Sequence, residues 1–304
     1  MKIDLIAGAR PNFIKISPII NAIKKANLKG ASIQFRLIHT GQHYDHDMSE
    51  SFFQQLDIPL PDINFNAGGG TQSQQTSKIM LKYEELLFKG KPEFCLLVGD
   101  VTSTLACSIV AKKMGLKVVH VEAGIRSGDM EMPEEINRIV TDSLTDYFFT
   151  TSEIANENLL KSGFEKDKIF FVGNTMIDTL LKNRIRFKKP NFWQSLKLKK
   201  KNYFILTLHR PSNVDNKNVL RNYLEEIVLY TNNIPILFPA HPRTEKIINS
   251  IKINLNNLFI LKPMSYLEFN YLVENSLAVI TDSGGVTEET TVMQVPCITI
   301  RDST

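Results

Sequence analysis

Short apolar runs alternate with amphipathic stretches along most of the chain. Residues 2–8 form the first apolar run, and isoleucines then recur at helical spacing over residues 13–25. Further strands are predicted at residues 32–38, 94–98, 117–121, 147–150 and 168–172. Short, continuous apolar strands separated by helices are typical of a parallel sheet that is covered on both faces. The pattern therefore predicts an α/β fold.

The periodicity breaks at residues 186–202, which are rich in lysine and carry little apolar patterning. A second series then predicts strands at residues 203–208, 234–238, 257–260, 278–281 and 296–300. We therefore expect two α/β domains, residues 1–172 and 173–304, with a helix from Thr175 opening the second. The chain stops at Thr304 directly after a predicted strand, where a parallel sheet continues into a helix, so we expect the second domain to be incomplete.

Composition narrows the class of protein. Of the 304 residues, 43% are hydrophobic and 22% charged, as in an ordinary folded protein. No apolar run reaches the roughly 18–20 residues that span a bilayer, and Lys2 and Asp4 interrupt the first run, which argues against a secretory signal. We therefore expect a cytoplasmic protein with no membrane partner.

Charge and cysteine content add little chemistry of their own. The net charge is +4, and the lysine-rich run at 197–201 is interpreted as a solvated linker or helix face, without a nucleic-acid-binding module. Cys95, Cys107 and Cys297 lack CxxC spacing, so they indicate small buried side chains in a reducing compartment and not a zinc site or a disulfide framework.

Polar residues gather where the predicted strands end, which is where open α/β sheets bind ligands. Gly8 leads into Arg10 and Lys15 at the start of a helix, a place suited either to an anion or to a plain tight turn. Asp100 follows the strand at 94–98, and Glu122 follows the strand at 117–121. Asp100 fits a helix N-cap as well as a catalytic acid, whereas an acid at the end of an apolar strand such as Glu122 needs a partner or a function.

A third acid lies at the start of the next helix. Glu134 and Arg138 are four residues apart and share one helix face. Acids in a first helical turn also complement the helix dipole. If Asp100, Glu122 and Glu134 meet at one edge of the sheet, they form the set of carboxylates that removing and returning a proton requires.

The second series carries a phosphate-binding pattern. His209 follows the strand at 203–208, and either contacts a phosphate, moves a proton or caps a loop. Ser283, Gly284 and Gly285 form a turn that opens a helix, where bare backbone N–H groups suit a diphosphate. Glu289, one turn further on, can accept hydrogen bonds from sugar hydroxyls. The segment has neither GxGxxG nor GxxxxGK[ST], which disfavours nicotinamide chemistry and ATP hydrolysis.

Taken together, these segments resemble the non-hydrolysing UDP-N-acetylglucosamine 2-epimerase family. The similar stretches, in family order, are GARPNFIKISPII (8–20), HTGQHYDHDMS (39–49), VGDVTSTLA (98–106), HVEAGIRS (120–127), MPEEINR (132–138), VGNTMIDTL (172–180), LTLHRPSNVDN (206–216), FPAHPRT (238–244), ITDSGGVTEE (280–289) and VPCITIRDST (295–304). Each is weakly specific alone, but the set covers nearly the whole chain.

The resemblance implies a GT-B-type architecture, with two Rossmann-like domains facing across a cleft that holds a UDP-sugar, and a homodimer. It implies interconversion of UDP-GlcNAc and UDP-ManNAc without a metal or nicotinamide cofactor, by elimination of UDP to 2-acetamidoglucal and re-addition. The roles it implies are proton transfer by Asp100, Glu122 and Glu134, action near the diphosphate by His209, charge binding by Arg10 and Arg138, an active-site place for Lys15, diphosphate binding by Ser283, Gly284 and Gly285, and ribose binding by Glu289.

Several alternatives stay open on the sequence. Relatives that epimerise UDP-2,3-diacetamido-2,3-dideoxy-uronic acids share similar motifs, and a GT-B glycosyltransferase or a UDP-sugar-binding protein would share the nucleotide site. Hydrolysing relatives lack the glutamate form of HVEAGIRS. Thr287 stands where many members have Gln, and residues 43–47 and 68–70 differ from members that bind a second, activating UDP-GlcNAc, so activation is not implied.

Overall fold

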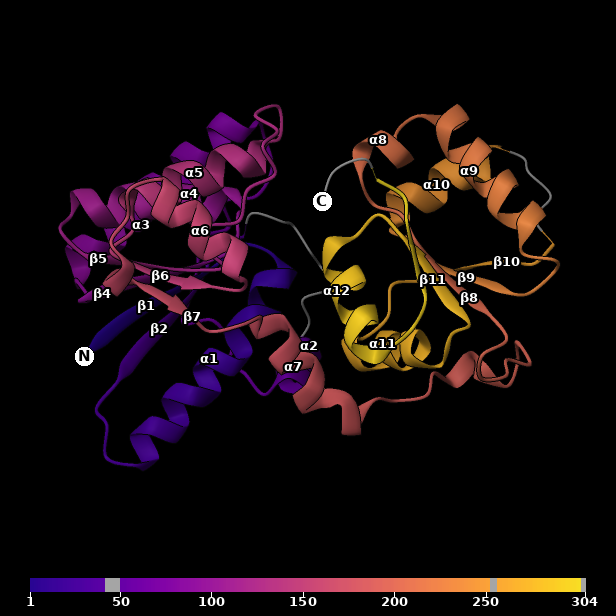
Figure 1. Cartoon of the computed structure of the whole chain (residues 1–304), viewed down its shortest axis with the longest axis horizontal. Helices are drawn as coiled ribbons and strands as arrows, with labels where there is room; N and C mark the ends of the chain where they lie inside the picture. Colours follow the sequence, from indigo (N-terminus) through magenta and orange to yellow (C-terminus); the bar gives the residue numbers. More distant parts are fainter. Residues whose placement is uncertain (42–49, 252–255, 302–304) are drawn as a thin grey trace. The chain divides into compact units, whose positions relative to one another are not determined.

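The chain forms two compact units, Met1–Thr179 and Leu180–Thr304. The computed structural model describes residues 1–41, 50–251 and 256–301, so the stretch at 43–47 lies outside the described residues (Figure 1). Each unit is a parallel sheet with helices on both faces. This confirms the predicted α/β class with two Rossmann-like domains.

The first unit is built on a seven-stranded sheet in the order β3-β2-β1-β4-β5-β6-β7. Its strands are β1 (Lys2–Ala7), β2 (Gln34–His39), β3 (Ile63–Asn64), β4 (Phe94–Val98), β5 (Lys117–Val121), β6 (Tyr147–Thr150) and β7 (Ile169–Phe171). The order of the strands reverses between β1 and β4, which pair in parallel. Such a switch point leaves room for a ligand beyond the carboxyl ends of the two strands.

Helices cover both faces of this sheet. They are α1 (Arg10–Leu28), α2 (Glu50–Leu56), α3 (Gln72–Lys89), α4 (Thr102–Lys113), α5 (Pro133–Leu144), α6 (Glu153–Lys161) and α7 (Thr175–Asn183). In Figure 1, α3, α4 and α5 lie on one face and α1 on the other. Each fully buried aliphatic side chain in the interface contributes about 2 kcal/mol to folding.

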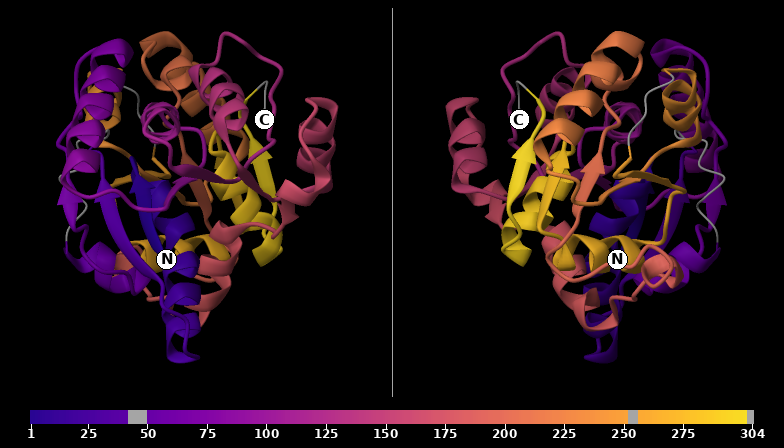
Figure 2. Two further views of the ribbon diagram at one scale, coloured as in Figure 1. Left: turned by 90° about the vertical axis from the view of Figure 1, so that its left-hand side faces the viewer. Right: turned by 90° about the vertical axis from the view of Figure 1, so that its right-hand side faces the viewer.

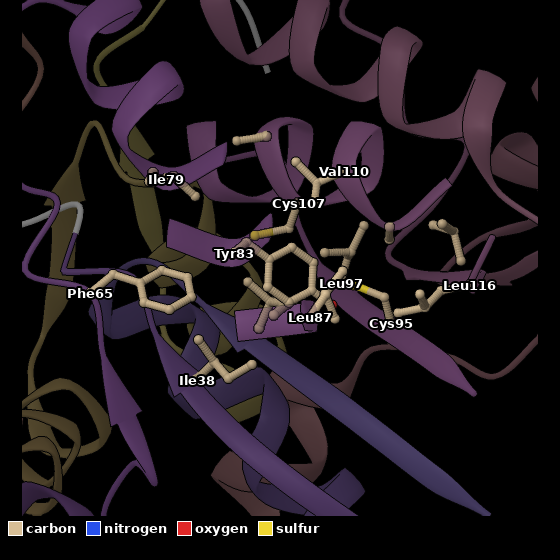
Figure 3. Packing of buried hydrophobic residues seen from close by; sticks show 14 of the residues in the cluster. Ile38, Phe65, Ile79, Tyr83, Leu87, Cys95, Leu97, Cys107, Val110 and Leu116 are labelled. Atoms are coloured by element: carbon tan, nitrogen blue, oxygen red, sulfur yellow. The ribbon is translucent and has the colours of Figure 1, made fainter. Parts of the chain in front are cut away.

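The core beneath α3 and α4 explains two of the cysteines. Tyr83 and Ile79 of α3 pack with Leu97 of β4 around Cys95 and Cys107 (Figure 3). Both thiols are free and buried, and burial raises their pKa well above the usual range. They are inert members of the core, as the sequence predicted.

The second unit has a five-stranded sheet in the order β10-β9-β8-β11-β12. Its strands are β8 (Phe204–Thr207), β9 (Ile236–Pro239), β10 (Leu258–Leu261), β11 (Ala278–Thr281) and β12 (Cys297–Thr299), and its helices are α8 (Pro211–Val214), α9 (Lys217–Tyr230), α10 (Pro242–Ile251), α11 (Tyr266–Asn275) and α12 (Gly284–Met293). Figure 2 shows β11 and β12 running side by side. The strand order reverses between β8 and β11.

The division between the units falls inside a helix. The sequence placed the boundary between residues 172 and 173, whereas the structure divides the chain within α7, after Thr179. The Thr179 hydroxyl donates to the carbonyl of Ile14 in α1, at 2.7 Å. This contact holds the first half of α7 on the first unit.

The lysine-rich stretch at 186–202 has more structure than its composition suggests. Trp193 is buried and meets Tyr203 and Tyr271 edge to face, with ring centroids 5.6 and 5.5 Å apart. The Lys201 amide donates to the carbonyl of Asn275 at 2.8 Å. The stretch therefore packs on the second unit while its lysines stay solvated. Among the described residues, no helix is both long and apolar enough to cross a membrane.

Candidate active site

Asn12 joins the two turns at the switch point of the first sheet. Its side-chain oxygen accepts from the amides of Gly8 and Ala9, at 3.2 and 2.9 Å, and its amide nitrogen donates to the carbonyl of Val98 at 2.9 Å. The side chain is buried, so these bonds are shielded from water. Asn12 thereby fixes the turn after β1 to the end of β4. This role was not predicted, because Asn12 stood out only as a member of a motif.

Lys15 and Glu122 form an ion pair beside this junction. Lys15 comes from the second turn of α1, and Glu122 follows β5 directly. A side chain at Gly99 would place its Cβ 3.5 Å from both the Glu122 carboxylate and the Lys15 amine, and Gly99 has φ +71°. That distance is an ordinary contact, so glycine is favoured at this position by its positive φ and not by lack of space.

Glu122 is held in an unusual backbone conformation, with φ 74°. A residue with a Cβ pays roughly 1–2 kcal/mol to occupy this left-handed region. The amides of Glu122 and Ala123 both donate to the carbonyl of Phe149, at 2.8 and 3.2 Å, which keeps the turn in place. Strain of this kind is enriched at functional sites, where it aims a side chain.

Asp100 and Arg138 form the second ion pair of the site. Nη2 of Arg138 lies 2.5 Å from Oδ2 of Asp100, and the side-chain nitrogen Nδ2 of Asn137 donates to the backbone carbonyl of Asp100 at 2.8 Å. Nη1 of Arg138 reaches Glu135 at 3.1 Å. Helix α5 therefore holds Asp100 in two ways: Asn137 binds the backbone carbonyl of Asp100, and Arg138 binds its carboxylate.

Two adjacent glutamates on α5 have opposite surroundings. Glu135 is 1% exposed and accepts from the amides of Ser127 and Gly128, at 2.9 and 3.1 Å. Burial alone would raise its pKa, but those amides and Arg138 lower it. Glu134, which the sequence favoured as an acid, is exposed. The structure thus gives the anchoring role to Glu135, which sequence reasoning missed because both glutamates fit the helix start equally well.

Arg10 lies at the start of α1, as predicted. Its guanidinium carbon is 5.1 Å from the centre of the Phe52 ring of α2. A cation over the face of an aromatic ring is attracted by that ring, which helps to fix the position of the Arg10 guanidinium. Phe52 itself is buried against Phe13 and Phe53, so Arg10 rests on a rigid surface.

In the second unit, His209 and Asp282 meet at the switch point between β8 and β11. Nδ1 of His209 lies 2.6 Å from Oδ1 of Asp282. The Asp282 carboxylate is fully buried and also accepts from the amides of His209 and Arg210 and from the side chain of Asn213, at 2.9–3.1 Å. These bonds outweigh desolvation and lower the pKa of Asp282 to about 2. The carboxylate therefore stays ionised and orients the imidazole.

The start of α12 follows Asp282 directly. The Ser283 hydroxyl caps the helix by accepting from the amide of Val286 at 3.4 Å. The guanidinium of Arg301 lies over the helix start, where a Cβ added at Gly284 would come 3.0 Å from its Nη1 and displace it slightly. Gly284 and Gly285 begin the helix without side chains. Positive helix dipole and arginine together favour an anion here.

Glu289 lies further along α12 and is 5% exposed. The hydroxyl of Tyr266 donates to it at 3.1 Å. Burial raises the pKa of Glu289 to about 7, against the opposing effect of the Tyr266 hydrogen bond. A buried carboxylate with a single neutral donor has capacity to accept further hydrogen bonds.

The predicted residues thus form two sets, one in each unit. Lys15, Asp100, Glu122 and Arg138 lie at the carboxyl ends of β4 and β5 or are paired with residues there. His209, Ser283, Gly284 and Gly285 lie at the switch point of the second sheet, with Glu289 in the same helix. The proton-transfer candidates Asp100 and Glu122 and the candidate diphosphate-binding turn 283–285 are therefore carried by different sheets.

Comparison with known sequences gives a consistent result. The family model described as UDP-N-acetylglucosamine 2-epimerase matches residues 25–304. The UDP-N-acetylglucosamine 2-epimerase of Methanocaldococcus jannaschii is 44% identical over 316 residues, covering 100% of this chain and 84% of the relative. The UDP-2,3-diacetamido-2,3-dideoxy-D-glucuronate 2-epimerase of Pseudomonas aeruginosa is 40% identical over 308 residues, again covering 100% and 84%.

Solved structures agree with the sequence comparison. The crystal structure of Methanocaldococcus jannaschii UDP-GlcNAc 2-epimerase in complex with UDP-GlcNAc and UDP has a TM-score of 0.89 and 43% identity, covering 100% of this chain and 85% of that one. The Neisseria meningitidis UDP-GlcNAc 2-epimerase bound to UDP-GlcNAc has a TM-score of 0.88 and 29% identity, covering 100% and 84%. Both likenesses extend over the whole chain.

Proposed function

The chain belongs to the UDP-N-acetylglucosamine 2-epimerase family, and we propose that it interconverts UDP-GlcNAc and UDP-ManNAc without hydrolysing them. The observation that carries this proposal is the pair of carboxylates at the ends of the neighbouring strands β4 and β5. Asp100 and Glu122 are each bound by one cation, Arg138 and Lys15. Two held carboxylates are what inversion at a carbon bearing hydrogen requires.

The reaction proceeds by elimination and re-addition. A carboxylate takes the C2 proton, the C1–C2 double bond forms from that electron pair, and the C1–O bond breaks to release UDP as an anion. In the reverse addition, a UDP oxygen bonds to C1 and a proton is delivered to C2 on the opposite face. Because removal and delivery occur on opposite faces, the chemistry uses two acid–base groups, and Asp100 and Glu122 fill those roles with Glu134 as a third acid.

Stabilising the departing UDP falls to groups of the second unit. Ser283, Gly284 and Gly285 at the start of α12 bind the diphosphate through backbone N–H groups. His209, held at Nδ1 by Asp282, acts through Nε2 in hydrogen bonding or proton transfer near the diphosphate. Glu289 accepts from the ribose hydroxyls, and Arg10 and Arg138 add positive charge.

The test is proton NMR of UDP-GlcNAc with the protein in D2O. We expect deuterium at C2 together with a UDP-ManNAc anomeric signal, because the proton removed from C2 exchanges with solvent before one is returned. Free UDP with free ManNAc would indicate hydrolysis instead. Recovery of unlabelled UDP-GlcNAc alone would rule the proposed reaction out.

A second sugar nucleotide is favoured by one comparison. The Pseudomonas aeruginosa relative, which carries the name of a UDP-2,3-diacetamido-2,3-dideoxy-D-glucuronate 2-epimerase, is 40% identical to this chain. The same elimination applies to that sugar, which adds a C6 carboxylate and a 3-acetamido group. Competition between the two nucleotides in one reaction separates the candidates: the preferred substrate has the larger kcat/KM.

We also propose that the protein forms a homodimer in the cytoplasm. Leu81 and Phe88 on α3 and Ile136 on α5 are 68%, 75% and 43% exposed, and such side chains favour contact with a second copy. The three free cysteines suit a reducing compartment. Light scattering on wild type and on Phe88→Asp tests the dimer, because a charge in the contact lowers the measured mass.

A further inference from the structure

His120 is a fully buried histidine with acceptors at both ring nitrogens. It lies in β5, two residues before Glu122. Nδ1 lies 2.7 Å from Oδ1 of Asp142, and Nε2 lies 2.9 Å from the carbonyl oxygen of Gly99. The exposed fraction of the ring is 1%.

The geometry determines where the protons are. A carbonyl oxygen only accepts, so Nε2 carries a proton. Asp142 also receives Nη1 of Arg126 at 2.7 Å and the amide of Gly124 at 3.1 Å, so it is ionised and needs a donor at Nδ1. Burial would lower the pKa of His120, but Asp142, the Gly99 carbonyl and the charge of Glu122 raise it above its usual value. Donation from both ring nitrogens, which these contacts call for, is what an imidazolium supplies.

The bonds of this imidazolium connect the segments that carry the acids. The carbonyl of Gly99 belongs to the peptide that joins Gly99 to Asp100. Asp142 lies one helical turn after Arg138 on α5 and also holds the turn after Glu122 through Gly124. One buried charge pair thus joins the end of β4, the end of β5 and the helix α5.

We propose that His120 is a positioning residue, locked between Asp142 and the Gly99 carbonyl so that Asp100 and Glu122 keep a fixed separation during catalysis. The proposal rests on the epimerase function given above. A misplacement of about 1 Å between reacting groups costs on the order of 100-fold in rate. Proton removal and delivery at opposite faces of one carbon make this reaction sensitive to that separation.

Stability alone does not account for the pair. Replacing a buried ion pair by well-packed apolar side chains is often neutral or stabilising. A charged pair buried among apolar strands is therefore better explained by the geometry that it imposes. In β5 the flanking residues Val119 and Val121 are also buried, and their apolar side chains need no such partner.

The first experiment compares His120→Asn and Asp142→Asn with Tyr83→Phe. The control removes a buried hydrogen bond to Asp4 at the other end of the strands, at 3.2 Å. Positioning predicts a fall in kcat of about 100-fold for both site variants, with KM and UDP binding within twofold of wild type and thermal unfolding showing a folded protein. The Tyr83→Phe control keeps wild-type kcat. If the site variants keep wild-type kcat per folded molecule, the proposal is wrong.

A second measurement does not depend on turnover. Nitrogen-15 NMR of histidine-labelled protein reports whether each ring nitrogen carries a proton. Wild type should show His120 protonated at both ring nitrogens at pH 7. Asp142→Asn should lose one of these protons at a lower pH than wild type does, and the alkaline limb of its kcat–pH profile should also shift to lower pH. A neutral His120 in the wild type overturns the inference. Absence of epimerisation in a protein with an imidazolium at this position refutes only the proposed function.

The groups facing His120 are few, which makes the pH shift interpretable. Asp142 approaches from α5, the Gly99 carbonyl from the end of β4, and Glu122 acts from the turn after β5. Arg126 and Lys15 pair with those two carboxylates. Replacing Asp142 alone therefore removes the main anion that keeps the ring protonated.

Discussion

The imidazole Nδ1 of His209 lies 2.6 Å from the carboxylate of Asp282, and the backbone amide of His209 donates to the same carboxylate. Asp282 thereby fixes both the position of the residue and the orientation of its ring. With a proton on Nδ1, the opposite nitrogen is free of this contact, and the side chain is 63% exposed. The arrangement presents Nε2 of His209 outward.

Asp282→Asn should reduce turnover about 100-fold, since losing the orienting carboxylate removes a general acid–base or charge-stabilising contribution of that order. The amide keeps the size of the side chain but no longer fixes the proton on Nδ1. Steady-state kinetics measure the effect. Asp215→Asn, which alters an exposed ion pair with Arg243, is the control and should retain wild-type kcat.

Asp100→Asn and Glu122→Gln should each abolish deuterium incorporation at C2 while UDP still binds. Both changes remove a base but leave the nucleotide-binding groups of the second unit unchanged. Calorimetry of UDP binding and NMR in D2O give the two readouts. Turnover like that of wild type in either variant would contradict the assigned roles, and Glu85→Gln on the exposed surface of α3 is the matched control.

Substitutions of the two adjacent glutamates of α5 should have different effects, one on stability and the other on activity. Glu135→Gln should lower the free energy of unfolding by about 2 kcal/mol, because the buried side chain loses charge-assisted bonds. Glu134→Gln should change the free energy of unfolding by no more than about 0.5 kcal/mol relative to wild type, but it should lower turnover. Urea unfolding and kinetics measure both. The stabilisation by Glu135 is present above the unfolded pKa and lost as pH falls through its lowered folded pKa, so equal effects at acidic and neutral pH would count against it.

Glu289 should make the second unit less stable as pH rises. Its folded pKa is about 7, whereas an unfolded glutamate titrates near 4.5. Between these values the folded protein holds a proton that is released on unfolding, so the free energy of unfolding falls as pH rises across that window. Above pH 7 the loss is nearly complete, and the free energy of unfolding is then lower by about 3 kcal/mol. Glu289→Gln should remove it and unfold at higher urea concentration than wild type at pH 8. Glu225→Gln on the exposed face of α9 should show the wild-type pH profile.

Most of the architecture follows from the apolar pattern. Strands β4, β5, β6 and β11 have the predicted bounds, because short, buried parallel strands are flanked by clear turn residues. The two-residue strand β3 and the packing of Trp193 were not predicted. Both depend on contacts distant in sequence, and neither has a period of its own.

The positions of the candidate site residues at the strand ends followed from the sequence, but the partners of these residues did not. The sequence indicated Asp100, Glu122 and His209, since a charged residue at the end of an apolar strand needs an explanation. It gave no means of choosing Glu135 over Glu134 as the partner of Arg138, because both lie in the same helical turn. Asp282 belongs to a motif that the sequence analysis identified, but its contact with His209 depends on the switch point that brings β8 beside β11.

The left-handed backbone at Glu122 brings heat resistance and the proposed activity into competition at one position. Glycine adopts φ 74° at lower cost than glutamate. Where relief of that strain outweighs the loss of the ion pair with Lys15, directed evolution for survival at high temperature alone would accept glycine there and, given the proposed role of Glu122, yield inactive descendants. A stabilised variant of practical use has to be selected with turnover as well as endurance in the screen.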